Sequence, residues 1–250
     1  MSEPMLELVG VTAGYGRTMV LFDVDVSLPV GGAAAVMGHN GAGKTTLVDA
    51  LTGLSHGTGT AEFRSHDLLT MKAHQIVHLG IGRTFQTASV FEQISVLQNL
   101  DIAAGLHRKA MGLLLPRRKV PERVDEVLET ISLSALAHHP AGILAHGQKQ
   151  WLEIGMLLVQ DAPVMFLDET VAGMSAEERE GTGELLRRIV GDRTIVVIEH
   201  DMDFMRSYAD FVTVMHAGKV LAEGTVSEIQ ADPRVQEVYL GTVAEVVNNG

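Results

Sequence analysis

The sequence predicts an α/β fold, with strands toward both ends of the chain and a helical segment inserted between them. Short apolar runs typical of strands occur before residue 92 and after residue 159, at Leu6–Val11, Leu21–Leu28, Ala33–Met37, Val164–Leu167 and Thr194–Ile198. From Val96 to Leu158 apolar residues recur only at helical spacing. We therefore expect a mixed-sheet core of residues 1–92 and 159–250, with an antiparallel N-terminal region, and a helical subdomain of residues 93–158.

Local signals add further elements. Ala13–Gly16 is typical of a turn after the first strand. A helix is expected to start near Lys44, because apolar residues follow it at helical spacing. A capping box, Ser175 with Glu178 three residues later, predicts the start of a helix between the last two strands. A hairpin is expected at 211–222, where two apolar runs flank a glycine-containing turn.

Composition restricts the function classes. The 250-residue chain has 19 Lys+Arg and 31 Asp+Glu, a formal charge of −12, which disfavours nucleic acid as a partner. It has no cysteine, which excludes disulfides and cysteine-ligated metals. The N-terminus lacks a signal-peptide pattern, and no apolar run approaches the roughly 18 residues that span a membrane. We expect a cytoplasmic protein without a transmembrane segment that is able to lie against a membrane protein.

A glycine-rich segment directly follows the run Ala33–Met37. It matches the full phosphate-loop pattern, and its members are Gly38, His39, Asn40, Gly41, Ala42, Gly43, Lys44 and Thr45, with Thr46 behind them. Glycines let backbone N–H groups turn inward around phosphates, and the next helix adds its positive end. Lys44 is expected to reach the β- and γ-phosphates of ATP, and the Thr45 hydroxyl to coordinate Mg²⁺. The alternative is a glycine loop without a ligand.

Two carboxylates follow the apolar run Val164–Leu167. In a fold with a phosphate loop, an acid at the end of a buried strand holds Mg²⁺, and here that acid is Asp168. Glu169 is placed to take the proton from an attacking water. Without the phosphate loop, such a pair would indicate a helix cap or a solvated turn. His200 ends the run Thr194–Ile198 in the same way, and its role depends on facing the same edge of the sheet.

Together these segments resemble an ABC-type ATPase subunit, which implies a RecA-like P-loop NTPase core. The phosphate loop, Gln86, Asp168-Glu169 and His200 occur in the order of that family. Between Gln86 and Asp168 lies a segment that resembles the family's signature motif at the start of a helix, formed by Leu144, Ala145, His146, Gly147 and Gln148. Tyr15 stands where the family has an aromatic residue that stacks on adenine.

The resemblance implies a head-to-tail dimer that encloses two ATP molecules. The helix after Gly147 would then offer its N-terminal end to the γ-phosphate bound by a second ATPase subunit. Gln86 would contact Mg²⁺ and the attacking water, and His200 the γ-phosphate. Residues Val171–Ser175 would cross the dimer interface.

Three positions depart from the family pattern. Ala145 replaces a serine, and a lost hydrogen bond to a charged group is worth roughly 1.5–3 kcal/mol. Felt fully in the transition state, this would slow hydrolysis about ten- to a hundredfold, so we expect a weakened ATPase. Thr170 replaces a proline, and Ser175 an aspartate, although Ser175 also reads simply as a helix cap.

The residues around these motifs narrow the resemblance to importers of the branched-chain amino acid and urea/amide group. Gly80–Thr87 and the ending Val238–Gly241 are similar to this group, and His146–Leu158 is most similar to the urea-transporter ATPase. We therefore expect uptake of urea or short-chain amides, with branched-chain amino acids as the alternative. The implied partners are a second ATPase subunit, expected to be a different chain, two membrane subunits, and an external solute-binding protein.

Other classes are open but less favoured. A non-transport ABC ATPase acting on DNA or ribosomes would have coiled coils or paired ATPase halves, which the chain lacks. A small-molecule kinase would not need the signature segment, and a partner that binds ATP without hydrolysing it would not need Glu169 and His200. The basic segment 105–123 is read as a solvated loop, with contact to a membrane surface or membrane subunit as the alternative.

Overall fold

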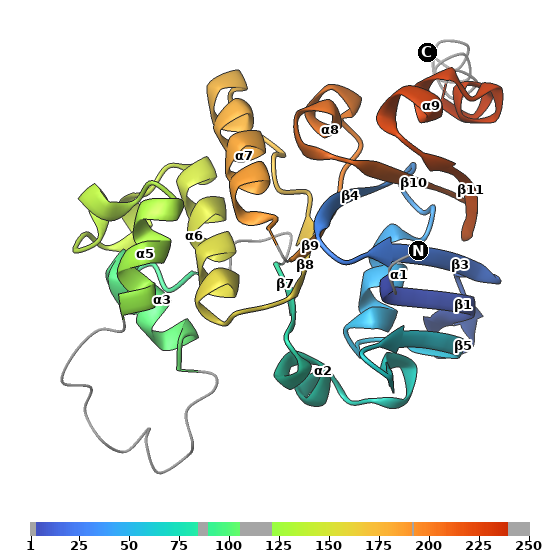
Figure 1. The fold of residues 1–250 in the computed structure, drawn as a ribbon, viewed down its shortest axis with the longest axis horizontal. Helices are drawn as coiled ribbons and strands as arrows, with labels where there is room; N and C mark the ends of the chain where they lie inside the picture. Colours follow the sequence, from blue (N-terminus) through green and yellow to red (C-terminus); the bar gives the residue numbers. More distant parts are fainter. Residues whose placement is uncertain (1–3, 85–89, 106–121, 192, 240–250) are drawn as a thin grey trace.

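The structure, a computed structural model, describes residues 4–84, 90–105, 122–191 and 193–239. Two sheets and the helices around them form the molecule (Figure 1). The smaller sheet is antiparallel and has the order β2-β1-β5-β6, with β3 also paired to β1. Its strands are β1 (Pro4–Tyr15), β2 (Thr18–Met19), β3 (Val24–Pro29), β5 (His56–Phe63) and β6 (His66–Asp67).

The larger sheet has the order β11-β10-β4-β9-β8-β7. All of its neighbouring strands run parallel except the hairpin pair β10–β11. Its strands are β4 (Gly32–Met37), β7 (Ile81–Arg83), β8 (Val164–Asp168), β9 (Thr194–Ile198), β10 (Phe211–His216) and β11 (Lys219–Gly224). The predicted α/β class with a mixed sheet and an antiparallel N-terminal region is therefore confirmed.

Helices connect and cover these strands. Among the described residues the labelled α-helices are α1 (Lys44–Leu51), α2 (Ala73–Leu79), α3 (Val96–Ala103), α5 (Glu122–Thr130), α6 (His146–Val159), α7 (Ala176–Ile189), α8 (Met202–Tyr208) and α9 (Val226–Ala231). Residues 233–239 are helical as well. Short 3₁₀ turns lie at Leu68–Thr70, Ser134–Leu136 and Ala141–Ile143. Helices α3, α5 and α6 pack on one another, away from the smaller sheet (Figure 1).

The larger sheet separates two apolar cores. Along β4, Ala34 and Val36 face the core shared with the smaller sheet and α1, whereas Ala33, Ala35 and Met37 face the core shared with α6, α7 and α8. Strands covered on both faces lack polar alternation, which explains the continuous apolar runs of β4, β8 and β9.

Several local expectations need correction. The first strand continues through Ala13, Gly14 and Tyr15, so the turn begins at Gly16, because these residues pair with β5 and with β2. Strands β5, β6 and β7 had no predicted counterpart. The sequence of β5 is rich in glycine, threonine and histidine, and its place depends on pairing with β1. The Ser175 cap of α7 is confirmed, since its hydroxyl accepts from the Glu178 amide at 3.3 Å.

Candidate functional site

The phosphate loop joins the end of β4 to the start of α1. Gly41 and Gly43 have φ of +82° and +104°, a backbone conformation that side chains disfavour. A Cβ on Gly43 would also lie 2.7 Å from the Leu21 side chain. Gly43 occupies the N-cap position of α1 and provides no side-chain cap, so the first N–H groups of this helix are left to a ligand. These features fit the binding of phosphate oxygens.

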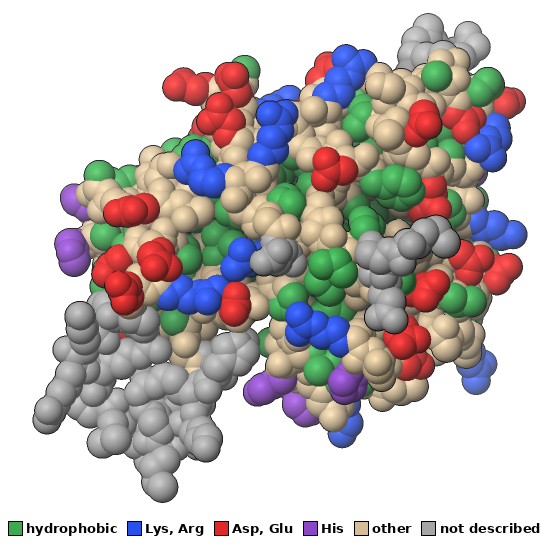
Figure 2. Space-filling view, in the orientation of Figure 1, with side chains coloured by type: hydrophobic (Ala, Val, Ile, Leu, Met, Phe, Trp, Pro, Cys, Tyr) green, Lys and Arg blue, Asp and Glu red, His purple; other side chains and the backbone are tan. Residues whose placement is uncertain are grey.

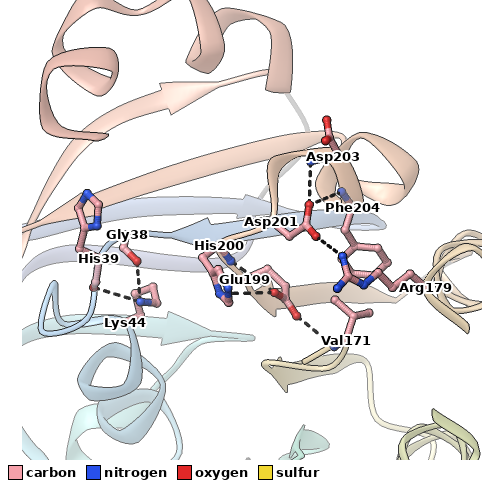
Figure 3. A network of polar contacts seen from close by, with 10 residues as sticks. All are labelled: Gly38, His39, Lys44, Val171, Arg179, Glu199, His200, Asp201, Asp203 and Phe204. Atoms are coloured by element: carbon pink, nitrogen blue, oxygen red, sulfur yellow. Dashed lines mark hydrogen bonds and ion pairs between the residues drawn. The ribbon is translucent and has the colours of Figure 1, made fainter. Parts of the chain in front are cut away.

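Lys44 points into this loop. Its Nζ donates to the carbonyl oxygens of Gly38 at 2.7 Å and His39 at 3.2 Å (Figure 3). Burial lowers the pKa of Lys44, and the carboxylates of Glu169, Asp168 and Glu199 act in the opposite direction. The ammonium group is therefore held by neutral carbonyls at the place where phosphate oxygens would be stronger acceptors.

The strand register brings the predicted catalytic residues to one edge of the sheet. Asp168 pairs with Ile198, and Ile198 with Val36, so β4, β8 and β9 end level with one another. The Glu199 amide donates to Val36 O at 3.2 Å, just beyond that level. Phosphate loop, acid pair and His200 therefore leave the sheet at the same edge, as parallel strands require for a shared ligand site.

Glu169 borders the phosphate loop directly. A cavity of about 190 Å³ is lined by Asn40, Gly41, Lys44, Thr45 and Glu169 among others. Glu169 has φ of +46°, and its amide donates to Ile198 O at 3.0 Å. A left-handed non-glycine residue costs free energy and is frequent at active sites. Here this backbone conformation turns the chain at the end of β8, beside Lys44.

Asp168 belongs to a buried ionic chain that the sequence analysis did not anticipate. Arg83 of β7 pairs with Asp49 of α1 and, at 3.2 Å, with Asp168; the side chains of Arg83 and Asp168 are 8% and 5% exposed. The Tyr15 hydroxyl donates to Asp49, and the Asp168 amide donates to Thr84 Oγ1 at 3.1 Å. These contacts run from Tyr15, which is expected to stack on adenine, to Asp168, which is expected to hold Mg²⁺.

At Asp168, burial and the charge of a neighbouring residue shift the pKa in opposite directions. Burial raises the pKa of Asp168, although the Arg83 guanidinium acts to lower it. Burial and the neighbouring Asp49 raise the pKa of Tyr15, so its hydroxyl stays a donor. One signal for Asp49 was present in the sequence: it lies four residues after Thr45, on the same face of α1. Arg83 gave no such signal, because β7 was not predicted.

The residues present also fit Mg²⁺ bound together with a nucleotide. Among the described residues no group of three or more His, Cys, Asp or Glu side chains is placed to hold a metal ion. Mg²⁺ does not require one, because it takes its ligands mainly from phosphates and water, with one or two protein oxygens. The Thr45 hydroxyl and the Asp168 carboxylate are oxygen donors of the required kind.

Glu199 and His200 follow β9. The Glu199 carboxylate is 1% exposed and accepts from the amides of Val171 at 3.2 Å and His200 at 3.4 Å, whereas the His200 side chain is 68% exposed (Figure 3). Burial raises the pKa of Glu199, and these amides act against that rise. Glu199 thus holds the backbone at Val171, which follows β8, and at His200, which follows β9. The sequence did not predict this role. The His200 side chain remains exposed.

The signature segment lies elsewhere, at the start of α6. Ala145 and His146 are exposed, whereas Leu144 and Gly147 are buried. The Gln148 side chain accepts a hydrogen bond from the Ala145 amide at 3.0 Å. Figure 1 shows α6 and α1 on opposite sides of strands β7–β9. The two predicted parts of the nucleotide site are therefore not brought together within one chain. Gln86 lies outside the described residues, as do Leu240, Gly241 and most of the basic segment 105–123.

A carboxylate already lies against the start of α6. Glu178 accepts from the Ser175 amide at 2.9 Å, and its side chain lies against Gly147. A Cβ on Gly147 would lie 2.7 Å from Glu178 Oε1. The nearby His146 Nε2 is 3.1 Å from the Ala172 carbonyl oxygen. The signature segment is thus tied to the loop 171–175 and to the first turn of α7.

The chain matches two protein-family models. Residues 21–172, which include the phosphate loop, Asp168 and Glu169, match the model described as ABC transporter. The chain belongs to the ABC transporter family. It is accordingly an ATPase. Residues 219–245 match a second model, described as branched-chain amino acid ATP-binding cassette transporter.

Curated relatives and solved structures agree with this membership. BraF of Pseudomonas aeruginosa and LivG of Escherichia coli, both named as high-affinity branched-chain amino acid transport ATP-binding proteins, are 30% and 34% identical. Each alignment covers 96% of this chain and 99% of the relative. The ADP conformation of MJ1267, an ATP-binding cassette of an ABC transporter, is 29% identical with a TM-score of 0.83, over 96% of this chain and 100% of that structure. CbiO1 from Clostridium perfringens is 26% identical with a TM-score of 0.81, over 99% and 100%.

Proposed function

We propose that this chain is the ATP-binding subunit of an importer of the branched-chain amino acid type, energised by hydrolysis of Mg-ATP at the phosphate loop. The observation that carries this proposal is the shared sheet edge, where Lys44 and Glu169 line one cavity and where Asp168 and His200 end or follow the neighbouring strands. The match of residues 219–245 and the names of the relatives support the branched-chain type.

Each residue has a defined part in the proposed site. Loop amides of residues 38–46 and Lys44 bind the phosphates, and Thr45 and Asp168 hold Mg²⁺, which neutralises charge on the phosphates when bound. Tyr15, 46% exposed, offers its ring face to adenine. Glu169 accepts the proton of the attacking water, and His200 donates to the γ-phosphate. Gln86, outside the described residues, stays a predicted ligand of Mg²⁺ and of that water.

The second half of the site comes from another ATPase subunit. The segment Leu144–Gln148 is exposed at Ala145 and His146 and lies away from this chain's own cavity, which supports an ATP-bound head-to-tail dimer. Whether that subunit is a second copy or a different chain is testable because the chain has no cysteine. Asn40→Cys on one copy and His146→Cys on another should form an ATP-dependent disulfide in a homodimer. In a heterodimer no such bond should form between two copies of this chain.

The proposed helical subdomain, residues 93–158, meets the proposed core at a groove. A cavity of about 290 Å³ is lined mainly by α2, β7 and the C-terminal half of α6, including Ala73, Val77, Ile81, Met156 and Leu157. This apolar groove reaches Thr84, two positions before Gln86 in the sequence, and it fits the docking of a short helix from a membrane subunit. Among the described residues, no helix is long and apolar enough to cross a membrane. With this groove as the docking site, we propose that the chain lies at the cytoplasmic face of a membrane, bound to two such subunits and served by an external binding protein.

Nucleic acid is not a proposed partner. On the face drawn in Figure 2, basic side chains are interspersed among acidic ones, and the chain's formal charge is −12. Such a surface offers no favourable field for a phosphate backbone. This argues for transport over an ABC ATPase that acts on DNA or ribosomes.

Uptake by the reconstituted complex decides the substrate. With its membrane subunits and binding protein in vesicles, the complex should take up labelled leucine, isoleucine or valine when ATP is present, and Glu169→Gln should abolish uptake. The similarity of His146–Leu158 to urea-transporter ATPases keeps urea and short-chain amides as the second candidate. Uptake of urea without leucine would select that candidate, and uptake of neither would overturn the importer proposal for these solutes.

A further inference from the structure

The C-terminal part of the described chain touches the phosphate loop. The residues 233–239 form a helix after α9. The Nε2 of His39 lies 3.2 Å from the carbonyl oxygen of Val238, so this nitrogen donates the hydrogen bond. The imidazole also stacks on the Tyr239 ring, with centroids 4.3 Å apart and planes inclined by 30°. Residues 200 positions apart in the sequence are thereby joined at the nucleotide site.

His39 has two separate tasks. Its carbonyl oxygen closes the loop, because it accepts from the Ala42 amide at 3.0 Å and from Lys44 Nζ at 3.2 Å. Its side chain points away from Lys44, as Figure 3 shows. The position of the His39 backbone therefore depends on where its imidazole is held. The hydrogen bond from Lys44 to the His39 carbonyl oxygen depends on it in turn.

Tyr239 is held by packing. Its ring is partly buried against the core that contains Val235, which is 3% exposed. Its hydroxyl is buried and has no hydrogen-bond partner among the described residues. Burial raises the pKa of Tyr239 to about 12, so the ring stays neutral. The ring, and not the hydroxyl, is what the C-terminal helix presents to His39.

We propose that Tyr239 is a positioning residue that, through His39, preorganises the phosphate loop and thereby sets its affinity for nucleotide. This inference rests on the phosphate loop being the nucleotide site proposed above. A loop that is already ordered loses less conformational entropy on binding, so its ligand binds more tightly. The C-terminal helix thus takes part in the ATP cycle without touching ATP.

The test measures ADP binding to the full chain by calorimetry. An aromatic pair of this kind corresponds to about a two- to tenfold change in dissociation constant, so Tyr239→Ala should weaken ADP binding by that factor. Tyr239→Phe, which keeps the ring, should bind ADP like the unchanged protein. In a His39→Ala background, Tyr239→Ala should have no further effect. The KM for ATP should follow the dissociation constant, with kcat unchanged.

Controls separate this proposal from a structural role and from the proposed site. Unfolding without ADP reports folding, and Tyr239→Leu replaces Tyr239→Ala if the alanine variant does not fold. Hydrogen exchange of 233–239 should slow with ADP in the unchanged protein but not in His39→Ala. Unchanged or tighter ADP binding by Tyr239→Ala, or an effect that persists without His39, would overturn the proposal. Unchanged ADP binding by Lys44→Ala would instead refute the nucleotide site itself.

Discussion

The starts of α1 and α6, the two helices that follow predicted nucleotide-binding segments, lack the side-chain caps of α3, α7 and α9. Helix α2, which begins after Lys72, lacks such a cap as well. Helices α3, α7 and α9 begin with Ser or Thr capping boxes, at Ser95 with Gln98, Ser175 with Glu178, and Thr225 with Glu228. In contrast, α1 begins at Gly43 and α6 at Ala145, which have no side-chain acceptor. A capped helix end has satisfied its N–H groups, so an uncapped end retains them for an anion.

The starts of α1 and α6 also differ from each other in the groups that surround them. At α1, Lys44 and the phosphate loop line a cavity. At α6 the Glu178 carboxylate of α7 lies against Gly147, where a Cβ would be 2.7 Å from Glu178 Oε1. The comparison indicates that α1 is built to bind phosphate by itself. In the proposed dimer the α6 end would face the partner's nucleotide, and a phosphate there would have the Glu178 carboxylate as its competitor.

Arg83 supports the α1 side, and its loss should have the largest effect on stability. Arg83→Met leaves the buried carboxylates of Asp49 and Asp168 without their shared cation, which should lower the free energy of unfolding by about 3–5 kcal/mol. Urea denaturation measures this change. Arg234→Met removes an exposed pair with Asp232 and should leave stability nearly unchanged. If Arg83→Met lowered the free energy of unfolding no more than Arg234→Met does, the contacts that join Tyr15, Asp49, Arg83 and Asp168 would have no structural role.

Lys44 places a positive charge at the start of α1, and removing this charge tests the comparison with α6. Lys44→Ala should weaken ATP binding about ten- to a hundredfold, because hydrogen bonds between charged groups are lost. Equilibrium titration with ATP measures it. Lys72→Ala, at an exposed position before α2, is the matched control and should bind ATP normally. Similar affinities for the two variants would remove the distinction drawn between α1 and the other helices.

Ala145 tests what the missing cap does at α6. The structure supplies only half of a capping box, from Gln148, so Ala145→Ser should raise the free energy of unfolding by about 1 kcal/mol. It should also raise ATP turnover, because a hydroxyl is restored to the partner's phosphate. The exposed Ala135→Ser is the control. A turnover equal to or below that of the unchanged protein would refute the role assigned to Ala145.

Glu178 gives the smallest effect, and it depends on pH. Hydrogen bonds from the Ser175 amide and hydroxyl lower the pKa of Glu178 below its ordinary value of 4.5. A depressed folded-state pKa stabilises the protein above the unfolded value, and this stability is lost as the pH falls through the folded value. Thermal unfolding should therefore separate Glu178→Gln from the unchanged protein at neutral pH, with the difference vanishing in acid. A difference between Glu178→Gln and the unchanged protein that persists in acid would contradict this assignment.

The sequence predicted those parts of the site that local patterns encode. The apolar runs of β4, β8 and β9 predicted strands, and their polar endings predicted a common edge, because parallel strands finish together. The capping box at Ser175 was equally local. In contrast, β5 and β7 contain few apolar residues and exist because long-range partners supply their hydrogen bonds.

Contacts between distant segments were likewise beyond local pattern. Arg83 meets Asp49 and Asp168, Glu178 meets Gly147, and His39 meets Tyr239, and each pair joins elements whose relative placement depends on the whole fold. The family resemblance named the parts of the nucleotide site, but it did not indicate which side chains position them.

Glu169→Gln tests the central claim, that this sheet edge is a hydrolytic ATP site, most directly. ATP binding and single-turnover hydrolysis are measured on the same preparation of this variant, with its required partner subunits present. Loss of a general base should slow hydrolysis at least about a hundredfold, while the dissociation constant for ATP stays within about twofold of the unchanged protein. Hydrolysis at the unchanged rate, or loss of ATP binding together with hydrolysis, would contradict the account.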